Sequence, residues 1–236
     1  MDERISRCNE YTEQNQGQKM SDEFIIDTTQ NMIRAGNAVS QDPFHHLPAV
    51  EWVQKQIDWR NKSDASGLGL EKLLVEHFAD KEIVGAEIGV CLAASTELFM
   101  KNVPSIKKYY AIDSYPTYID WNGADFNEER QKLMKQYAID VLKPFKEKIE
   151  FVYEDSSTFA NSIEDESLDF IFIDGDHSYE GFTKDLSSYF PKVKKGGIVS
   201  GDDITLTTIS NGLNDFFSEN KPDIKTGEKM WYLIKE

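Results

Sequence analysis

Two apolar segments of the chain each end in side chains that bind cations or move protons. Residues 170–173 (Phe-Ile-Phe-Ile) and 197–200 (Gly-Ile-Val-Ser) read as strands of a buried sheet. The side chains that follow them are Asp174, Asp176, His177, Asp202 and Asp203. In an open α/β sheet, ligands bind beyond the carboxyl ends of the strands. Carboxylates gathered there repel one another unless a cation lies between them, so the pattern predicts a hard divalent ion.

The segments around these groups alternate between short apolar runs and amphipathic stretches, which is typical of parallel βαβ units. We expect strands at 83–88, 109–112, 149–153, 170–173, 197–200 and 231–234. The helices expected between them cover 95–101, 126–142, 159–163, 179–189 and 209–217. Before residue 83, helical spacing predicts a helix that starts near Ser21, a second that starts at Pro48 and a third over 70–78. The expected fold class is α/β, with a doubly wound, Rossmann-like sheet and additional N-terminal helices.

The length and charge of the chain limit its organisation and its partners. At 236 residues it can bury one substantial core, and we expect one main domain with an N-terminal elaboration. The expected division is a polar leader at 1–20, a helical cap at 21–80 and the main domain at 81–236. The formal net charge of −16 disfavours negatively charged partners, so neither nucleic acid nor a membrane is expected. Small molecules, glycans or a local basic groove remain open, and the sequence leaves open whether the chain forms a homo-oligomer.

Two cysteines, Cys8 and Cys91, are too few for a disulfide framework. We expect both to be reduced thiols, which indicates a cytoplasmic location. The chain has no apolar stretch that approaches the ~20 residues of a membrane-spanning helix. Its first residues also lack the apolar core of a signal peptide.

The turns after the first three expected strands could hold a nucleoside ligand. Residues 87–96 contain one tight glycine, Gly89, and form neither a dinucleotide GxGxxG motif nor a P-loop. Free backbone N–H groups at such a turn can hold a carboxylate. The second strand ends in Asp113, and an acid at this position holds the ribose diol in doubly wound folds. The third strand ends in Asp155 and Ser156, which can bond the edge of a purine.

The segments EIGVCLAAST, AIDSY, EDSS, IDGDHSYEG and GGIVSGDD occur in this order along the chain. Their order and spacing resemble class I S-adenosylmethionine-dependent methyltransferases. The closest resemblance is to the macrocin-type, metal-dependent sugar O-methyltransferases, with catechol O-methyltransferase as a more distant relative. It covers roughly residues 65–236, and DGDHSYEG and GDD are its specific elements. The resemblance implies a seven-stranded, mostly parallel sheet whose last strand, residues 230–234, is antiparallel.

The resemblance also implies roles for individual residues. Cofactor contacts fall on Glu87, Gly89, Ser95, Asp113, Asp155, Ser156 and Asp174. Ser95 would bind the methionine carboxylate of S-adenosylmethionine, Asp113 its ribose, and Asp155 with Ser156 its adenine. Ligands to Mg²⁺ (or Mn²⁺) are Asp174, Asp202 and Asp203. The catalytic base is Asp176 by similarity to the macrocin-type enzymes, or His177 by similarity to the catechol enzymes. Such families usually carry a second glycine where Ala93 stands.

The sequence therefore predicts a Mg²⁺-dependent O-methyltransferase that moves a methyl group from S-adenosylmethionine to a hydroxyl of a sugar or glycosylated small molecule. Two alternatives stay open: a phenolic or catechol O-methyltransferase, and a non-catalytic module that binds S-adenosylmethionine. Aspartates at strand ends also cap turns and helices, so each of these acids has a structural alternative. We expect Asp185 to lie on a solvated helix face, and the loop 115–123, with Trp121, to close over the ligands as a lid.

Overall fold

The computed structural model of the chain describes residues 42–63, 65, 67–119 and 123–236. Three predicted features lie outside the described residues: the leader, the helix that starts near Ser21, and Trp121 of the lid. In the part that is described, no helix is long and apolar enough to cross a membrane.

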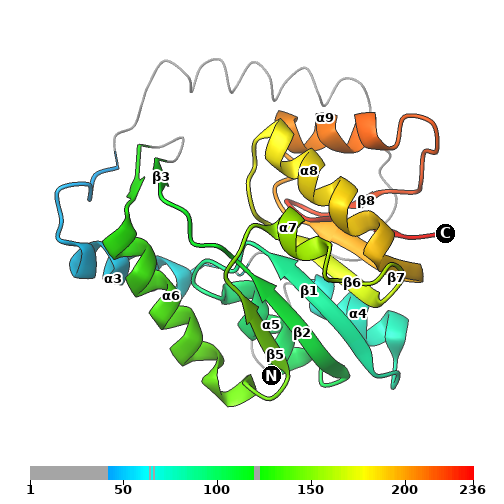
Figure 1. Cartoon of the computed structure of the whole chain (residues 1–236), viewed down its shortest axis with the longest axis horizontal. Helices are drawn as coiled ribbons and strands as arrows, with labels where there is room; N and C mark the ends of the chain where they lie inside the picture. The colour runs from blue at the N-terminus through cyan, green and yellow to red at the C-terminus, as the bar shows by residue number, and fades with distance from the viewer. Residues whose placement is uncertain (1–41, 64, 66, 120–122) are drawn as a thin grey trace.

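Seven of the described strands form one sheet in the order β5-β2-β1-β6-β7-β9-β8 (Figure 1). They are β1 (Ile83–Ile88), β2 (Ile106–Ile112), β5 (Ile149–Val152), β6 (Leu168–Ile173), β7 (Val193–Gly201), β8 (Lys225–Thr226) and β9 (Trp231–Ile234). The pairs among β5, β2, β1, β6 and β7 are parallel, whereas β9 pairs antiparallel with both β7 and β8. The predicted doubly wound sheet and its antiparallel last strand are confirmed.

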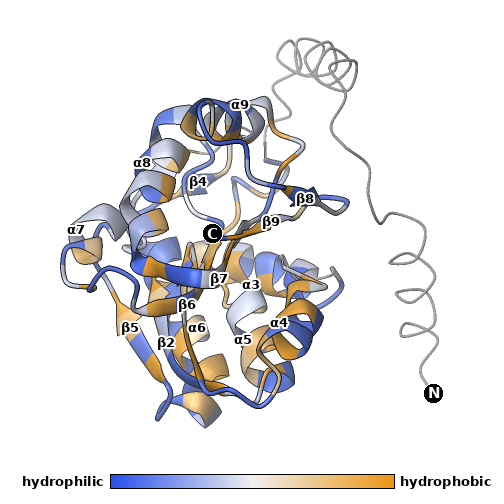
Figure 2. Cartoon of the chain, turned by 90° about the vertical axis from the view of Figure 1, so that its right-hand side faces the viewer, coloured by the Kyte–Doolittle hydropathy of each residue, from blue (hydrophilic) through white to orange (hydrophobic). Residues whose placement is uncertain are grey.

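Helices cover both faces of this sheet (Figure 1). The described α-helices are α3 (Ala49–Arg60), α4 (Leu70–Phe78), α5 (Ala94–Asn102), α6 (Glu128–Leu142), α7 (Ser156–Ala160), α8 (Tyr179–Tyr189) and α9 (Thr207–Phe216), of which α3 packs on α6. Ile171 and Ile173 of β6 belong to the core under α7, α8 and α9, while Phe170 and Phe172 belong to the core under α4, α5 and α6. Side chains alternate between the faces of a strand, so a strand buried on both faces must be apolar at nearly every position. Figure 2 shows this as hydrophobic colour on the central strands and hydrophilic colour on the outer sides of the helices.

The register of the sheet brings the carboxyl ends of four adjacent strands to one level. Ile88 of β1 is paired with Ile112 of β2 and with Ile173 of β6, and Ile173 is paired with Gly201 of β7. The residues directly after these strand ends are Gly89, Asp113, Asp174 and Asp202. The strand order reverses between β1 and β6, and doubly wound sheets bind their ligands at this switch point.

The described part of the expected helical cap at 21–80 contains α3 and α4. The helix predicted to start at Pro48 is present, but α3 begins one residue later, at Ala49, and Pro48 is its N-cap. Trp52 on the inner face of α3 is fully buried in a cluster that includes residues of α6. The guanidinium of Arg130, in the first turn of α6, donates to the carbonyls of His45 (3.1 Å) and Leu47 (3.3 Å). These bonds tie the segment before α3 to α6.

Three local features differ from the expectation. Strand β7 begins at Val193 and continues through the expected Gly196-Gly197 break, because Gly196 takes a φ of 76° and the pairing with β6 shifts register in this part of β7. Helix α7 begins earlier than expected because Asp155 caps its first turn. The antiparallel pair β3 (Tyr118–Ile119) and β4 (Asp125–Phe126), and also β8, were not predicted, since two-residue strands carry no detectable alternation.

Candidate functional site

Three of the predicted side chains meet beyond the carboxyl ends of β6 and β7. Nε2 of His177 lies 3.3 Å from Oδ1 of Asp174 and 3.3 Å from Oδ2 of Asp203. One ligand atom from each of the three residues lies within 4.8 Å of the others. Two carboxylate oxygens and an imidazole nitrogen form a mixed donor set, which suits Mn²⁺ and related first-row ions as well as Mg²⁺.

The backbone on both sides of this cluster is held in place. Thr208, in the first turn of α9, donates its hydroxyl hydrogen to the carbonyl of His177 at 2.7 Å. Ser178 caps α8 by accepting the N–H of Gly181 at 3.0 Å. Asp203 has a left-handed φ of 55°, which turns the chain sharply after β7. Contacts from α8 and α9 therefore position a cluster whose residues come from two strand ends.

The cluster carries more negative than positive charge. Burial raises the pKa of Asp174 to about 6, where the charges of Asp202 and Asp203 act with burial and His177 acts against it. Burial also raises the pKa of Asp203. For His177, burial lowers the pKa, but the contact with Asp174 and the nearby carboxylates outweigh burial, and the net pKa is raised. A bound cation would relieve the repulsion among these carboxylates.

Two predicted side chains lie outside the cluster. Asp176 is exposed and accepts the N–H of Ser178 at 2.8 Å. It lies over Gly181, where an added Cβ would be 2.3 Å from Oδ2 of Asp176, so its carboxylate faces the first turn of α8. An anion is stabilised at that end of a helix. Asp202 is buried, and among the described ligand atoms its carboxylate is not part of the group that meets within 4.8 Å.

The turn between β1 and α5 follows a backbone path that glycine adopts most easily. Gly89, Cys91 and Ala93 have φ angles of 89°, 50° and 59°. A left-handed conformation costs a residue other than glycine roughly 1–2 kcal/mol, so Cys91 and Ala93 need support from other contacts. A Cβ on Gly89 would also lie 2.0 Å from the carbonyl oxygen of Asp174. The close approach that requires glycine here is to the backbone after β6.

Asp113 holds the same turn from the end of β2. Its Oδ2 accepts the N–H of Cys91 at 2.8 Å, and its Oδ1 accepts the N–H of Tyr115 at 2.7 Å. Burial raises the pKa of Asp113, and these N–H groups together with that of Val90 oppose the rise. A carboxylate has about four acceptor positions, so three backbone bonds leave one for a ligand hydroxyl.

Glu87 and Ser95 are buried. Glu87 is 1% exposed and accepts hydrogen bonds from the hydroxyl groups of Thr96 and Tyr109. Burial raises the pKa of Glu87 to about 8, although the Thr96 hydroxyl opposes the rise. Ser95 lies in the first turn of α5. The visible role of Glu87 is to join β1 to α5 and β2, and the cofactor contacts of both residues stay predictions.

Asp155 and Ser156 join α7 to α8. Asp155 caps α7 by accepting the N–H of Thr158 at 3.0 Å, and it forms an ion pair with Lys184 at 3.1 Å. A hydrogen bond from Ser157, supported by those from Thr158 and Lys184, lowers the pKa of Asp155. The hydroxyl of Ser156 donates to a carboxylate of α8. Both residues lie at the carboxyl end of β5, as predicted, and their adenine contacts stay predictions.

The carboxylate that Ser156 contacts belongs to Asp185, and the expectation for this residue was wrong. Asp185 is only 5% exposed, so it does not lie on a solvated helix face. Burial raises the pKa of Asp185 to about 6, although the Ser156 hydroxyl opposes the rise. Helical spacing from Phe182 and Tyr189, both buried, puts Asp185 on the inner stripe of α8. That signal was present in the sequence.

Arg60, the last residue of α3, contacts the turn after β1 although no sequence pattern singled it out. Its Nε donates to the carbonyl of Leu92 at 2.9 Å, and its Nη2 donates to the carbonyl of Ala93 at 3.2 Å. Arg60 and Leu92 are 32 residues apart in the chain, and no local pattern predicts a contact over that separation.

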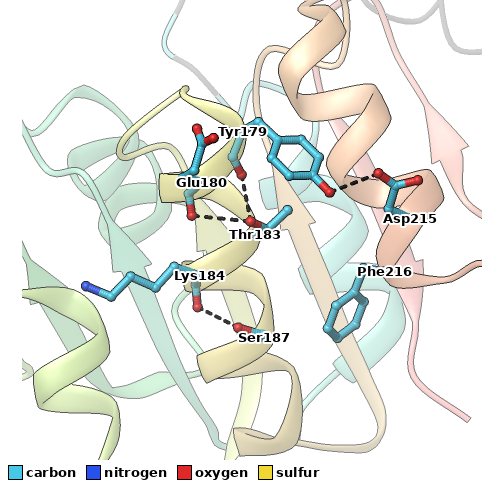
Figure 3. A pocket seen from close by; sticks show the side chains of 7 residues that line it. All are labelled: Tyr179, Glu180, Thr183, Lys184, Ser187, Asp215 and Phe216. Atoms are coloured by element: carbon cyan, nitrogen blue, oxygen red, sulfur yellow. Dashed lines mark hydrogen bonds between the residues drawn. The ribbon is translucent and has the colours of Figure 1, made fainter.

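A separate hollow lies on the outer surface between α8 and α9 (Figure 3). Tyr179, Thr183 and Phe216 are among the residues that line it, and the hydroxyl of Tyr179 donates to Asp215 at 2.9 Å. None of the strand-end side chains described above lines this hollow. The candidate site is therefore the edge of the sheet.

Residues 86–204 match the family model of a methyltransferase domain. The match runs from β1 to just beyond β7 and includes Gly89, Asp113 and Asp203. An uncharacterized protein of Acanthamoeba polyphaga mimivirus is 28% identical over 137 residues, which are 55% of this chain and 55% of that protein. The chain thus spans about half the length of this curated relative.

Solved structures share the fold at low sequence identity. A Staphylococcus aureus protein proposed to be a caffeoyl-CoA O-methyltransferase is 14% identical to this chain. The two structures superpose with a TM-score of 0.57 over 89% of this chain and 100% of that chain. The calicheamicin methyltransferase CalS11 is 15% identical, with a TM-score of 0.53 over 93% of this chain and 98% of that chain. At these identities the likeness concerns the fold alone.

Proposed function

Because the chain belongs to the methyltransferase family whose domain model matches residues 86–204, we propose that it is a metal-dependent O-methyltransferase. Its donor is S-adenosylmethionine, and its acceptor is a hydroxyl group of a sugar or glycosylated small molecule. The family supports the methyl donor, and the cluster of Asp174, His177 and Asp203 supports the metal. The sugar acceptor rests on the resemblance of the DGDHSYEG and GDD segments to the macrocin-type enzymes.

The observation that supports the proposed metal dependence is the position of His177 between two carboxylates. Nε2 is 3.3 Å from an oxygen of Asp174 and 3.3 Å from an oxygen of Asp203. A ring nitrogen bears at most one hydrogen, and both distances exceed the usual 2.7–3.2 Å of an N–H···O bond. One proton therefore satisfies neither contact fully. A divalent cation would engage all three atoms, so the residues present fit this group.

The roles of the chain's own residues follow from their surroundings. A divalent cation bound here would lower the pKa of an acceptor hydroxyl and orient its oxygen. Asp174, His177 and Asp203 would hold the cation, and the buried Asp202 would add negative charge beside them. Asp176 lies outside this donor set, is exposed and accepts one N–H. We therefore assign it, and not His177, as the base that takes the proton from the acceptor.

The ends of β1 and β2 fit the methyl donor. Asp113 retains an acceptor position for a ribose hydroxyl after its bonds to the turn. Helix α5 begins at Ala94, directly after the turn, and the first N–H groups of a helix suit a carboxylate such as that of methionine. The turn thus offers an anion site on one side and Asp113 on the other.

A turnover assay tests this function. The purified full chain is incubated with S-adenosylmethionine and a panel of nucleotide sugars, free glycans and catechols, with Mg²⁺, with Mn²⁺, or with EDTA. We expect methylation of a sugar hydroxyl that EDTA abolishes and either ion restores. Full activity in EDTA would remove the metal from the proposal. Binding of S-adenosylmethionine without turnover of any acceptor would favour the non-catalytic module.

A phenolic acceptor is the second candidate, and a group of aromatic rings near the turn favours it. The rings of Tyr118 and Phe126 stack with centroids 4.5 Å apart, and Trp52 packs edge-on against Phe126 at 5.1 Å. Tyr118 is 47% exposed. A flat aromatic acceptor packs well against exposed rings. The catechols in the panel decide between the two acceptor classes.

A further inference from the structure

The guanidinium of Arg60 binds the turn between β1 and α5 from outside the sheet. Its side chain is 11% exposed, and it donates to the carbonyls of Leu92 (2.9 Å) and Ala93 (3.2 Å). Nη2 of Arg60 also pairs with Oε2 of Glu97, in α5, at 2.6 Å. One planar, forked group therefore joins α3 to the turn and to the helix that follows it.

The direction of these carbonyls sets the direction of the neighbouring N–H groups. In a trans peptide the C=O and N–H bonds point opposite ways. The carbonyl of Leu92 points to Arg60, and the N–H of the same peptide unit, that of Ala93, donates to Val90 at 2.7 Å. The carbonyl of Ala93 accepts from Arg60 at 3.2 Å and from the N–H of Glu97 at 3.0 Å, so the N–H of Ala94 points away from the guanidinium. Ala94 is the first residue of α5.

The conformation that Arg60 contacts is one that the residues of the turn do not prefer. Cys91 and Ala93 have φ angles of 50° and 59°, where glycine is the favoured residue. A glycine-rich turn samples this shape without help. Here the N–H of Ala93 bonds the carbonyl of Val90 within the turn, and Arg60 and Asp113 add contacts from outside it at its carbonyl and N–H groups.

We propose that Arg60 is a positioning residue that holds the turn in the shape that binds the carboxylate of the cofactor's methionine end. Arg60 does not touch the cofactor itself. It acts by helping to orient the first N–H group of α5. It also stabilises the left-handed conformation of Ala93, which glycine would adopt without support. This proposal rests on the proposed function, since it takes an S-adenosyl ligand as the occupant of the site.

The test compares two ligands that differ at the methionine end. S-Adenosylhomocysteine carries the amino-acid carboxylate, and 5′-methylthioadenosine lacks it. Isothermal titration of the full chain should show that Arg60→Met weakens S-adenosylhomocysteine at least about tenfold and methylthioadenosine less than about threefold. Equal weakening of both ligands, or of neither, would overturn the proposal.

A second substitution tests the role of the turn conformation. Ala93→Gly, added to Arg60→Met, should recover at least about threefold of the lost affinity for S-adenosylhomocysteine, because glycine adopts the left-handed conformation without support. No recovery in the double variant would show that Arg60 does not act through this conformation.

Arg130→Met is the matched control. Arg130 is also buried and donates to three carbonyls, those of Asp125, His45 and Leu47, which all lie outside the turn. The affinity of the Arg130→Met variant for both ligands should stay within about twofold of that of the parent. A loss selective for S-adenosylhomocysteine in this variant too would overturn the proposal.

Two further measurements distinguish a wrong proposal from a variant that does not fold and from a wrong proposed function. Circular dichroism and thermal melting confirm that each variant is folded. If Arg60→Met does not fold, Arg60→Lys replaces it, since lysine keeps the charge beside Glu97 but cannot reach both carbonyls with a fork. If the parent chain binds neither ligand, the proposed function fails; if the parent binds and Arg60→Met or Arg60→Lys binds alike, only this inference fails.

Discussion

A Cβ atom on Gly89 would lie 2.0 Å from the carbonyl oxygen of Asp174, so the turn after β1 packs directly on the turn after β6. The N–H of Asp174 donates to the carbonyl of Ile88 at 2.9 Å and completes this contact. The proposed cofactor turn and the proposed metal cluster therefore share one backbone contact. A disturbance of this contact reaches both parts of the site.

Gly89→Ala should reduce the free energy of unfolding by at least about 3 kcal/mol, since the new methyl group meets backbone atoms that cannot rotate away. Urea unfolding measures the change. Gly196→Ala is the matched control, because Gly196 also has a positive φ of 76° but nothing within 4 Å of its added Cβ. The control should lose about 1 kcal/mol from its φ alone. Equal losses in the two variants would contradict the close approach at Gly89.

His177→Ala and Asp203→Ala should each weaken Mn²⁺ binding at least about tenfold, because each removes one of three donor atoms that lie within 4.8 Å of one another. Titration calorimetry measures the affinity. Glu180→Ala, which removes an exposed acid of α8, should bind Mn²⁺ as the parent does. Asp176→Asn should keep the Mn²⁺ affinity and lower turnover by about 10²-fold or more, as expected for loss of a base. Unchanged Mn²⁺ affinity in His177→Ala would remove His177 from the donor set.

Asp113→Ala should weaken S-adenosylmethionine binding at least about tenfold, because it removes a charge-assisted bond to the ribose and loosens the turn at Cys91. Calorimetry measures the affinity, and thermal melting verifies that the variant is folded. Asp165→Ala, at an exposed acid that pairs with Lys192, is the control and should bind like the parent. A folded Asp113→Ala variant with full affinity would show that the ribose lies elsewhere.

Asp185→Asn should stabilise the protein at pH 8 and have little effect at pH 4. Folding raises the pKa of Asp185 from 3.8 to about 6 by burial. An acid whose pKa is raised on folding favours the folded state fully below its unfolded-state pKa, and this contribution is lost as the pH rises through the folded-state pKa. The loss is on the order of 3 kcal/mol, and asparagine avoids it because it does not ionise.

Urea unfolding of Asp185→Asn and of the parent chain between pH 4 and pH 8 checks this prediction. The gain in unfolding free energy should appear between pH 4 and about pH 6 and then level off. Asp165→Asn, at an exposed acid, should show no such rise. A difference between Asp185→Asn and the parent that does not change with pH would contradict a buried, raised acid.

The sheet and the location of the site were predictable from the sequence because both depend on local patterns. The apolar run at 170–173 predicts a strand buried on both faces, and the helical segments around it indicate parallel pairing. Parallel strands end at one edge, so Asp113, Asp174 and Asp203 had to lie at that edge. The antiparallel last strand was predicted from the resemblance to a family, and the pairing of β9 with β7 confirms the prediction.

The direction of each side chain at that edge was not predictable. Asp174 and Asp176 follow the same strand, yet only Asp174 joins the cluster, because the carboxylate of Asp176 accepts the N–H of Ser178 at the start of α8. A turn of two or three residues has several backbone paths of similar energy. The contacts of α8 and α9 select among them, and these contacts come from tertiary packing.

Local patterns in the sequence predict which residue types reach the edge of the sheet, since hydrophobic periodicity and strand ends are properties of neighbouring residues. Which of these residues meet, and that Arg60 of α3 and Asp185 of α8 contact them, depends on the packing of the folded chain. Arg60 is 32 residues from Leu92 in the chain, and Asp185 is 29 residues from Ser156. Contacts over such separations depend on how whole helices pack, which no local pattern encodes.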